Sequence, residues 1–433
     1  MNEPDLSQSA DAILRRLEGL GIRLGLDRMR EMLAQLKNPE KSVPAVLVAG
    51  SNGKGSTSAL LASIGQAAGY RTALYTSPHL ERVEERLQID GAPVSSGSLG
   101  NILSRIVEIT ESSGDGLPTY FEAMTLAAFL WFAEERADLS VLEVGLGGRL
   151  DATNVAEPIL SLITSISLEH REMLGDTLAA VAKEKAGILR PGKSALAWIE
   201  APEALASARA EAARIGAKLA SAPDRVRIVG TKPRGWDGQK VEIETARARY
   251  RLDLALPGAH QLRNLGLAVA AAEELTDLGW TRIDQGTIER GVASCRWPGR
   301  LESIRLKNGK RIVLDAAHNP EGAEMLGRFL AERRKEDGEP VDLLLGLLGD
   351  KDASEMLEFL IPHVAKIVLT APPSPRAKDP AELAALLPHG IAAEVVPDLG
   401  QALERALATS PRTLVVCGSI FLIGAVRERL RGR

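Results

Sequence analysis

The feature that most constrains this chain is a short apolar segment, Ala45 to Ala49, that leads into a glycine-rich turn and then into a helical segment. The turn reads Gly50-Ser51-Asn52-Gly53-Lys54-Gly55-Ser56-Thr57. Its glycines let backbone N–H groups and the helix N-terminus face a triphosphate, and Lys54 supplies a point charge. This succession predicts a nucleotide-binding βα unit. The alternative is an ordinary glycine-rich turn with a surface lysine.

The spacing within this turn is unusual. A standard phosphate loop has four residues between its first glycine and the Gly-Lys pair, whereas only Ser51 and Asn52 lie between them here. We interpret the segment as a shortened variant whose ATP contacts come from Asn52, Gly53, Lys54, Gly55, Ser56 and Thr57. The loop alone indicates nucleotide binding and no particular reaction.

Short apolar runs alternate with amphipathic segments of helix length from about Val43 to the end, which is typical of an α/β protein with a mainly parallel sheet. The strands expected first are 45–49, 72–75, 140–144 and 160–164. The helices expected with them are 56–68, 121–135, 177–189 and 261–278. After a Pro-Gly pair at Pro298-Gly299, strands are expected again at 311–314, 342–346, 366–370 and 413–417.

This restart of the pattern predicts two domains. We place a phosphate-loop domain that binds the nucleotide at residues 1–297, and a smaller, Rossmann-like α/β domain at 298–433. A chain of 433 residues exceeds what one hydrophobic core usually supports, which favours this division.

Composition excludes several classes of protein. The formal charge of −4 gives no basic excess for binding nucleic acid. Cys295 and Cys417 are too few for a disulfide framework or a cysteine zinc site. The start lacks the pattern of a signal peptide, and the longest apolar runs fall short of the ~20 residues of a membrane span. We therefore expect a cytoplasmic protein with no membrane or nucleic-acid partner.

Two further motifs narrow the interpretation. They are Tyr75-Thr76-Ser77-Pro78-His79-Leu80 and Glu143-Val144-Gly145-Leu146-Gly147-Gly148-Arg149-Leu150-Asp151-Ala152-Thr153-Asn154. Together with Gly53 to Thr57, they resemble the folylpolyglutamate synthase and dihydrofolate synthase family of the Mur ligase superfamily. The resemblance continues in order through Leu168-Glu169-His170, Glu184-Lys185-Ala186-Gly187-Ile188, His260-Gln261 with Asn264, Pro298-Gly299-Arg300-Leu301-Glu302, Leu314-Asp315-Ala316-Ala317-His318-Asn319-Pro320, and Gly418-Ser419.

The resemblance implies an ATP-dependent ligase. In this family ATP phosphorylates a substrate carboxylate, and the amine of L-glutamate then attacks the acyl phosphate. The expected acids are dihydropteroate, a reduced folate, or both. Such chemistry relies on positioning and charge neutralisation, so two Mg²⁺ ions are expected with the ATP. By the same resemblance we expect a monomer.

Ser77, Glu143 and His170 resemble the family's magnesium ligands. Glu143 ends an apolar strand, where its side chain would enter the crevice at the carboxyl edge of the sheet. The alternatives are a turn residue for Ser77, a solvated carboxylate for Glu143 and a hydrogen-bonded structural histidine for His170. Imidazole is also not a favoured ligand of magnesium.

Lys185 occupies the position of a carbamylated lysine in related ligases, and we assign it, with Lys54 and His318, to the catalytic group. Carbamylation requires the neutral amine and hence a lowered pKa. The alternative for Lys185 is a solvated helix face.

Asn264, Arg300 and Asp315 correspond to the family's ATP contacts. Arg300, at the domain junction, would reach the phosphates and couple domain closure to catalysis. An interdomain salt bridge is the alternative for Arg300. His318 and Ser419 correspond to positions near the incoming glutamate, although a capping role would explain both equally well.

The pterin is expected against the first domain. The family pattern assigns it to Leu24, Gly25, Leu26, Asp27, Thr119, Tyr120, Phe121, Leu150, Asp151 and Ala152. The aromatic pair suits a flat heterocycle, but Phe121 is equally compatible with a helix core face.

Departures from the family pattern are small: Ser51 for threonine, Glu169 for aspartate and Ala316 for glycine. Three other interpretations stay open. They are a Mur-type ligase acting on a cell-wall precursor or other carboxylic acid, a nucleotide-dependent regulatory module, and a small-molecule kinase.

Overall fold

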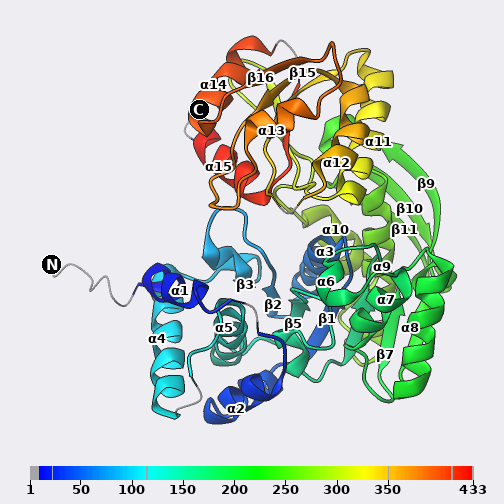
Figure 1. Ribbon diagram of the computed structural model, residues 1–433. Coiled ribbons are helices and arrows are strands. Elements are labelled where there is room, and N and C mark those ends of the chain that lie inside the picture. Colours follow the sequence, from blue (N-terminus) through cyan, green and yellow to red (C-terminus); the bar gives the residue numbers. More distant parts are fainter. Residues whose placement is uncertain (1–8, 22, 114–115, 350, 411–412, 432–433) are drawn as a thin grey trace.

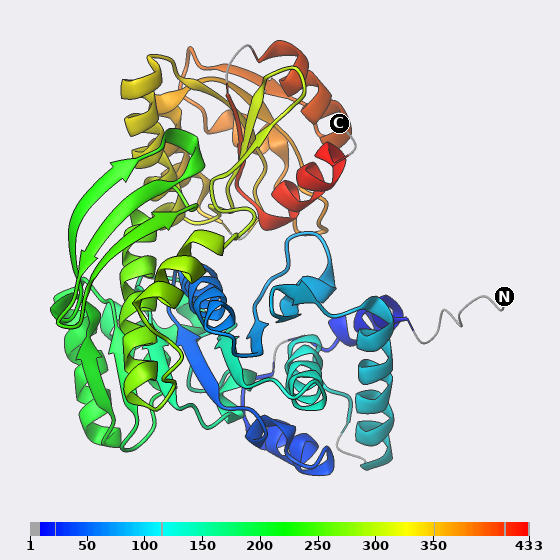
Figure 2. The ribbon, with the colours of Figure 1, turned by 180° about the vertical axis from the view of Figure 1, so that it is seen from behind.

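The computed structural model describes residues 9–431, apart from 22, 114–115, 350 and 411–412. Two α/β bodies are stacked one above the other, and a small antiparallel sheet bridges them along one side (Figures 1 and 2). The lower body contains the phosphate loop. No helix in the described ranges combines the length and the apolar character needed to cross a membrane.

An eight-stranded sheet forms the centre of the first body, in the order β4-β3-β2-β5-β1-β6-β7-β8. Its strands are β1 (Ala45–Ala49), β2 (Thr72–Tyr75), β3 (Leu87–Ile89), β4 (Ala92–Pro93), β5 (Leu139–Glu143), β6 (Leu160–Ile163), β7 (Ser194–Ala197) and β8 (Lys218–Ser221). β1 lies between β5 and β6 and pairs with both in parallel. The carboxyl ends of these three strands therefore meet at one edge of the sheet.

Helices cover both faces of this sheet. Leu47 of β1 packs in one core with α1, α2, α4 and α5, whereas Val46 and Val48 pack in a second core with α3, α9 and α10. This alternation follows the two-residue period of a strand buried on both faces. The helices of the body are α1 (Ala10–Glu18), α2 (Asp27–Gln35), α3 (Lys54–Ala67), α4 (Ser96–Ser113), α5 (Tyr120–Glu134), α6 (Arg171–Leu174), α7 (Leu178–Ala186), α8 (Pro202–Ile215), α9 (His260–Asp277) and α10 (Gln285–Ser294).

A three-stranded antiparallel sheet follows α8 in the sequence. It consists of β9 (Arg227–Pro233), β10 (Gln239–Glu244) and β11 (Arg249–Leu254). Its inner face joins the core of the first body, and the turn between β9 and β10 reaches the second body (Figure 2). There Trp236 is buried, donates from Nε1 to Asp337 at 3.0 Å, and packs edge-on against Phe329.

The second body is built on a six-stranded sheet in the order β12-β13-β17-β14-β15-β16. Its strands are β12 (Glu302–Arg305), β13 (Arg311–Leu314), β14 (Val341–Leu345), β15 (Val364–Leu369), β16 (Ala392–Val395) and β17 (Leu414–Cys417). All pairings are parallel except β12 with β13. α11 (Pro320–Asp337), α12 (Ala353–Leu360) and α13 (Pro380–Ala385) cover one face, and α14 (Leu399–Thr409) and α15 (Ile420–Leu430) cover the other.

The predicted α/β fold class is confirmed. The strands that the sequence predicts correspond to β1, β2, β5, β6, β13, β14, β15 and β17, and their bounds differ by at most two residues from those predicted. The predicted helix at 177–189 is shorter, because α7 ends at Ala186 and Gly187 follows as its C-cap. The proposed domain boundary between residues 297 and 298 falls in the connection between α10 and β12.

Candidate active site

A cleft of about 230 Å³ opens between the two bodies, where the loops after β1 and β5 face the loop after β13. Twelve of the residues singled out from the sequence line it. They are Asn52, Gly53, Lys54, Gly55, Ser56, Ser77, Glu143, His170, Asn264, Arg300, Asp315 and His318. Segments from most of the chain therefore converge on one cavity.

The phosphate loop is held in shape by its own domain. Gly53 has φ +86°, and a Cβ there would lie 2.2 Å from Oδ1 of Asn264, so both backbone conformation and space require glycine. Lys54 turns back and donates from Nζ to the carbonyls of Gly50 at 2.8 Å and Ser51 at 3.0 Å. Thr57 is buried within α3 and does not line the cleft.

Lys185 lies directly behind this loop. Its side chain is 1% exposed, and Nζ donates to Glu169 at 2.6 Å and to the Gly50 carbonyl at 2.9 Å. Burial lowers the pKa of Lys185 to about 8, although Glu169 opposes this shift. The alternative of a solvated surface lysine is therefore wrong, because the helix face that carries Lys185 packs against the loop.

Glu143 occupies the sheet edge opposite Lys54. It is buried, so the alternative of a solvated strand end is also wrong. The backbone N–H of Ser77 donates to its Oε2 at 3.1 Å. Burial raises the pKa of Glu143, while Lys54 and Arg300 favour its ionised form. His170 borders the same cavity with an exposed side chain and a left-handed backbone, φ +45°.

The second body contributes Arg300, Asp315 and His318. Within the described ranges, the Arg300 guanidinium has no hydrogen bond or ion pair. The alternative of an interdomain salt bridge for Arg300 is therefore not supported there. Asp315 accepts from the backbone N–H groups of Leu301 and Ala317, both at 2.9 Å. Burial lowers the pKa of His318 to about 4, so its imidazole is neutral at pH 7.

Several residues assigned to substrate binding have structural roles. Thr119 caps α5, Asp151 caps the 3-10 turn Ala152–Val155, and Ser419 caps α15 by accepting from the backbone N–H of Phe421. Phe121 comes nearest the cleft, since a Cβ on the cleft residue Gly145 would lie 2.5 Å from its ring. The remaining pterin assignments, including Leu24 at 55% exposed, lie outside the cleft lining and stay predictions.

Sequence reasoning missed part of the cleft. Arg263 and Glu321 both line it, one from α9 and one from the first turn of α11. Neither belongs to a motif, and a charge in a helix is ordinarily a solvated one. No signal in the sequence indicated that these two residues meet.

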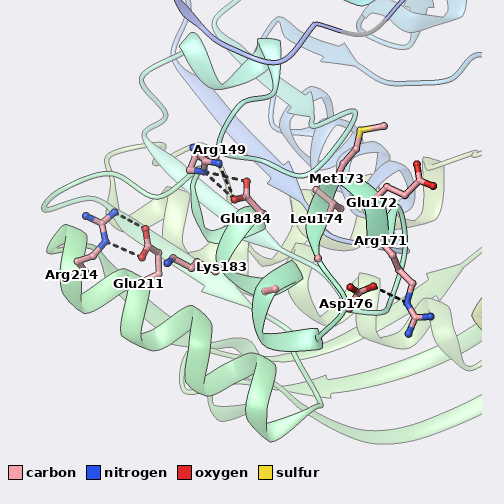
Figure 3. Close-up of a pocket in the computed structure, with 12 residues that line it drawn as sticks. Arg149, Arg171, Glu172, Met173, Leu174, Asp176, Lys183, Glu184, Glu211 and Arg214 are labelled. Carbon is pink, nitrogen blue, oxygen red and sulfur yellow. Dashed lines mark hydrogen bonds and ion pairs between the residues drawn. The ribbon is translucent and has the colours of Figure 1, made fainter.

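A wider hollow lies on the outer surface of α6, α7 and α8 (Figure 3). Its charged side chains neutralise one another, as in the pair Arg214–Glu211 at 2.6 Å and the pair Arg149–Glu184 at 3.0 Å. Arg149 and Glu184 of the quoted motifs line this hollow, but no residue that was assigned a catalytic or binding role does so. The chemistry is therefore expected in the cleft between the two bodies.

Family models match both parts of the chain. Residues 48–272 match the Mur ligase middle domain, and residues 299–420 match the Mur ligase glutamate ligase domain. Fold and cleft together thus define a two-domain ATP-dependent ligase of the Mur type.

Full-length relatives specify the family further. The chain is 34% identical to the dihydrofolate synthase/folylpolyglutamate synthase of Bacillus subtilis, over 95% of this chain and 96% of that protein. It is 31% identical to the folylpolyglutamate synthase of Lacticaseibacillus casei, over 94% of each. The chain belongs to the folylpolyglutamate synthase and dihydrofolate synthase family.

Solved structures agree with this assignment. Escherichia coli FolC in complex with DHPP and ADP superimposes with a TM-score of 0.85 at 31% identity, covering 100% of both chains. The Mycobacterium tuberculosis folylpolyglutamate synthase, solved with ADP and AMPPCP, gives 0.86 at 31% identity, covering 98% of this chain and 99% of that one.

Proposed function

We propose that this protein is an ATP-dependent ligase that adds L-glutamate to dihydropteroate, to reduced folates, or to both. The reaction runs through an acyl phosphate and releases ADP and phosphate. One observation carries the proposal: the phosphate loop, Glu143, Arg300 and Asp315 line one cleft between two bodies, in a chain related over its length to enzymes of this name. We further propose that it acts as a cytoplasmic monomer.

Lys54 and Arg300 are the groups suited to the phosphates. Among the described residues, Lys54 donates hydrogen bonds only to carbonyls of its own loop, and Arg300 has no hydrogen-bond or ion-pair partner. Both cations are available to an anion that enters between them. They would balance the charge that develops on the transferred phosphoryl group and hold it near the acid substrate.

Magnesium fits the opposite wall. Glu143 is a buried carboxylate with one oxygen held by a backbone N–H, and Ser77 adjoins it with a hydroxyl. Magnesium prefers oxygen ligands and retains water, so one or two protein oxygens beside phosphate oxygens suffice. When bound, two such ions would neutralise phosphate charge. We assign Ser77 and Glu143 to this role, and His170 as a less favoured third ligand.

Carbamylation of Lys185 is part of the proposal. Its lowered pKa of about 8 makes the neutral amine accessible near neutral pH, which the addition of carbon dioxide requires. In the present conformation Nζ is bound to Glu169, so the modification requires that ion pair to open.

The incoming amine must meet the acyl phosphate in the same cavity. His318 lies on the wall formed by the second body, where its neutral ring is bound through Nδ1 to the Ala316 carbonyl at 2.8 Å. We assign to it the orientation of the glutamate. The acid substrate would enter past Gly145 and Phe121, whose ring offers an apolar face.

The test is phosphate release from the purified protein with Mg-ATP and glutamate, comparing dihydropteroate with tetrahydrofolate and identifying the products by mass. A glutamate added to both acids establishes a bifunctional synthase, and a glutamate added to one assigns that activity. No addition to either acid refutes the proposal. Lys54→Ala should lower the rate by about 100-fold, whereas Lys183→Ala, on the exposed side of α7, should leave it unchanged.

A further inference from the structure

Asn52 in the phosphate loop makes hydrogen bonds to both bodies, through its main chain to the first and through its side chain to the second. Its main chain belongs to the first body, because its N–H donates to Ser165 Oγ at 3.0 Å and its carbonyl accepts from Thr164 Oγ1 at 2.7 Å. These bonds fix the backbone of the loop without using the Asn52 side chain. The side chain is therefore free to serve another purpose.

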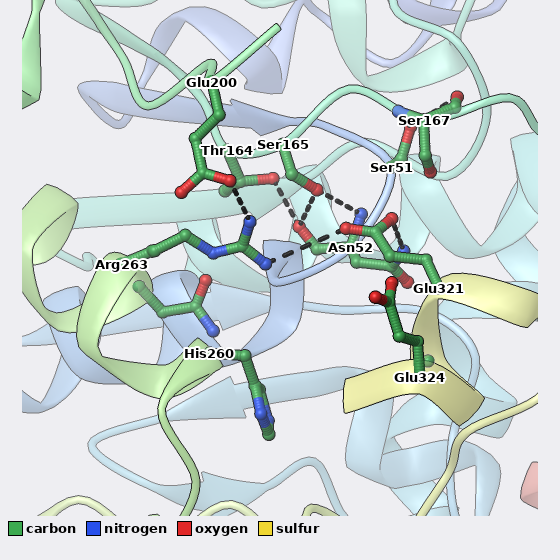
Figure 4. A network of polar contacts seen from close by, with 12 residues as sticks. Ser51, Asn52, Thr164, Ser165, Ser167, Glu200, His260, Arg263, Glu321 and Glu324 are labelled. Atoms are coloured by element: carbon green, nitrogen blue, oxygen red, sulfur yellow. Dashed lines mark hydrogen bonds and ion pairs between the residues drawn. The ribbon is translucent and has the colours of Figure 1, made fainter. Parts of the chain in front are cut away.

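That side chain bonds to the second body (Figure 4). Nδ2 of Asn52 donates to the Glu321 carboxylate, and Oδ1 accepts from Asn319 Nδ2 at 3.4 Å. Asn319 and Glu321 form the N-cap and first turn of α11, directly after His318. The phosphate loop thus contacts the segment that carries a proposed glutamate-binding residue.

Arg263 supports the same contact from α9. Its guanidinium lies 3.8 Å from Glu321 Oε1 and 3.0 Å from Glu200 (Figure 4). Arg263 and Glu321 are each 22% exposed, so solvent reaches the contact only in part. This partial burial strengthens the hydrogen bond between Asn52 and Glu321 relative to one on an open surface.

A simpler explanation treats Glu321 as an acidic residue that stabilises the start of a helix. The next acidic residue of α11, Glu324, shows what that explanation predicts, since it pairs with Arg328 on its own helix. Glu321 instead crosses the cleft to a residue 269 positions earlier in the chain. Helix stabilisation alone does not account for this direction.

We propose that Asn52 and Glu321 form an interdomain latch, which holds the start of α11, and His318 with it, in register with the phosphate loop. Glu321 is then a positioning residue that acts through Asn52. This inference rests on the proposed glutamate ligation. The latch works by a hydrogen bond, so an amide at position 321 should serve nearly as well as the carboxylate.

The kinetic test compares Glu321→Ala, Glu321→Gln and the matched control Glu324→Ala. Glu321→Ala should lower kcat/KM for glutamate by about tenfold, because misplacement of the second body impairs the attack of the amine. The dissociation constant for ATP should change by less than about threefold, since the first body holds the loop. Glu321→Gln should recover most of the loss, and Glu324→Ala should match the unmodified protein.

Three kinetic results would overturn the latch. Unchanged kinetics in Glu321→Ala would show that the contact has no consequence. Equal losses in Glu321→Gln and Glu321→Ala would show that the carboxylate charge itself is required. Parallel losses of ATP and glutamate affinity would indicate a general structural defect.

A second measurement does not depend on activity. The double variant Asn52→Cys with Glu321→Cys should form a disulfide under mild oxidation much faster than Asn52→Cys with Glu324→Cys, as seen by mass. Equal rates of disulfide formation would refute the latch, even if the protein ligates glutamate. Fast disulfide formation between positions 52 and 321, in a protein that adds glutamate to neither acid, would instead support the latch and refute the proposed function.

Discussion

Lys54, Lys185 and Arg300, the cations in or just behind the cleft that the proposed function uses, differ in what holds them. Lys54 is bound to carbonyl groups of its loop and Lys185 to Glu169, while Arg300 has no partner within the described ranges. Carbonyl groups hold an ammonium less strongly than a carboxylate does. Lys54 and Arg300 are thus the cations that an incoming polyphosphate can bind most easily, whereas Lys185 stays paired with Glu169.

His79 provides a test of electrostatics just beyond the cleft. Arg86 Nε donates to its Nδ1 at 3.0 Å, so this nitrogen must be unprotonated. Burial, with a further contribution from Arg86, lowers the pKa of His79 to about 4 from 6.5. Because the unfolded chain then binds a proton more readily than the folded one, stability should fall as the pH drops from 6.5 towards 4.

By this linkage His79 should account for about 1–2 kcal/mol of the stability lost between pH 7 and pH 5. Denaturant unfolding at both pH values is the measurement, with His79→Gln as the comparison. The glutamine offers an acceptor oxygen to Arg86 but does not titrate, so its stability should depend less on pH. An identical pH dependence in both proteins would contradict the assignment.

Among the elements, α15 shows how closely the two bodies approach. A Cβ at Gly424 would lie 1.9 Å from the carbonyl oxygen of Leu80, in the loop that follows β2. Next to this contact, Arg427 bridges Glu81 of the first body and Glu302 of the second, at 2.9 Å from the latter. The helix can dock here only because position 424 has no side chain.

We therefore expect Gly424→Ala to destabilise the protein by about 1–3 kcal/mol, because the backbone of either element must shift to admit a methyl group. The measurement is denaturant unfolding. Gly97→Ala is the control, since nothing lies within 4 Å of a Cβ at that position in α4. The control should be neutral or stabilising by up to about 1 kcal/mol, and equal losses in both variants would argue against the steric explanation.

Elements carried by continuous apolar runs were predictable from the sequence. β1 and β17 are buried on both faces, so their residues are apolar throughout and their bounds were readable. The sheet β9–β11 was missed because one of its faces is charged. The alternation of Val241 and Ile243 with polar neighbours was a readable signal of strand β10.

Within the cleft, residues that belong to contiguous motifs lie together, since Lys54, Glu143 and Arg300 all line one cavity. The motifs preserve local geometry, so their members are recognisable without a structure. Contacts such as Asn52 with Glu321 could not be predicted, since each partner looks ordinary in its own segment. Only the docking of the two bodies makes them neighbours.

At the scale of the whole molecule, Trp236 joins the bodies at a point away from the cleft. Its ring lies 5.4 Å from Phe329, and the Arg333 guanidinium lies 5.7 Å from the ring centre. Trp236→Ala should lower the free energy of unfolding by about 3 kcal/mol, since it removes a large buried side chain. It should also loosen the bridge between the bodies.

Small-angle scattering and denaturant unfolding together test this prediction. Trp236→Ala should increase the radius of gyration as well as lower stability. Trp280→Ala is the control, because Trp280 packs against Tyr70 within the first body and should affect stability alone. An unchanged radius of gyration in Trp236→Ala would show that the other contacts suffice to hold the bodies together.

The position of Trp236 also bears on how such a chain can be shortened or recombined. In the sequence this residue precedes the connection between α10 and β12, yet its indole belongs to the core of the second body. A fragment that begins at this connection would lack the indole ring and expose the apolar surface around Phe329. The two halves are therefore poor candidates for separate expression or for exchange between homologues, because the strands that flank Trp236 belong to the core of the first body.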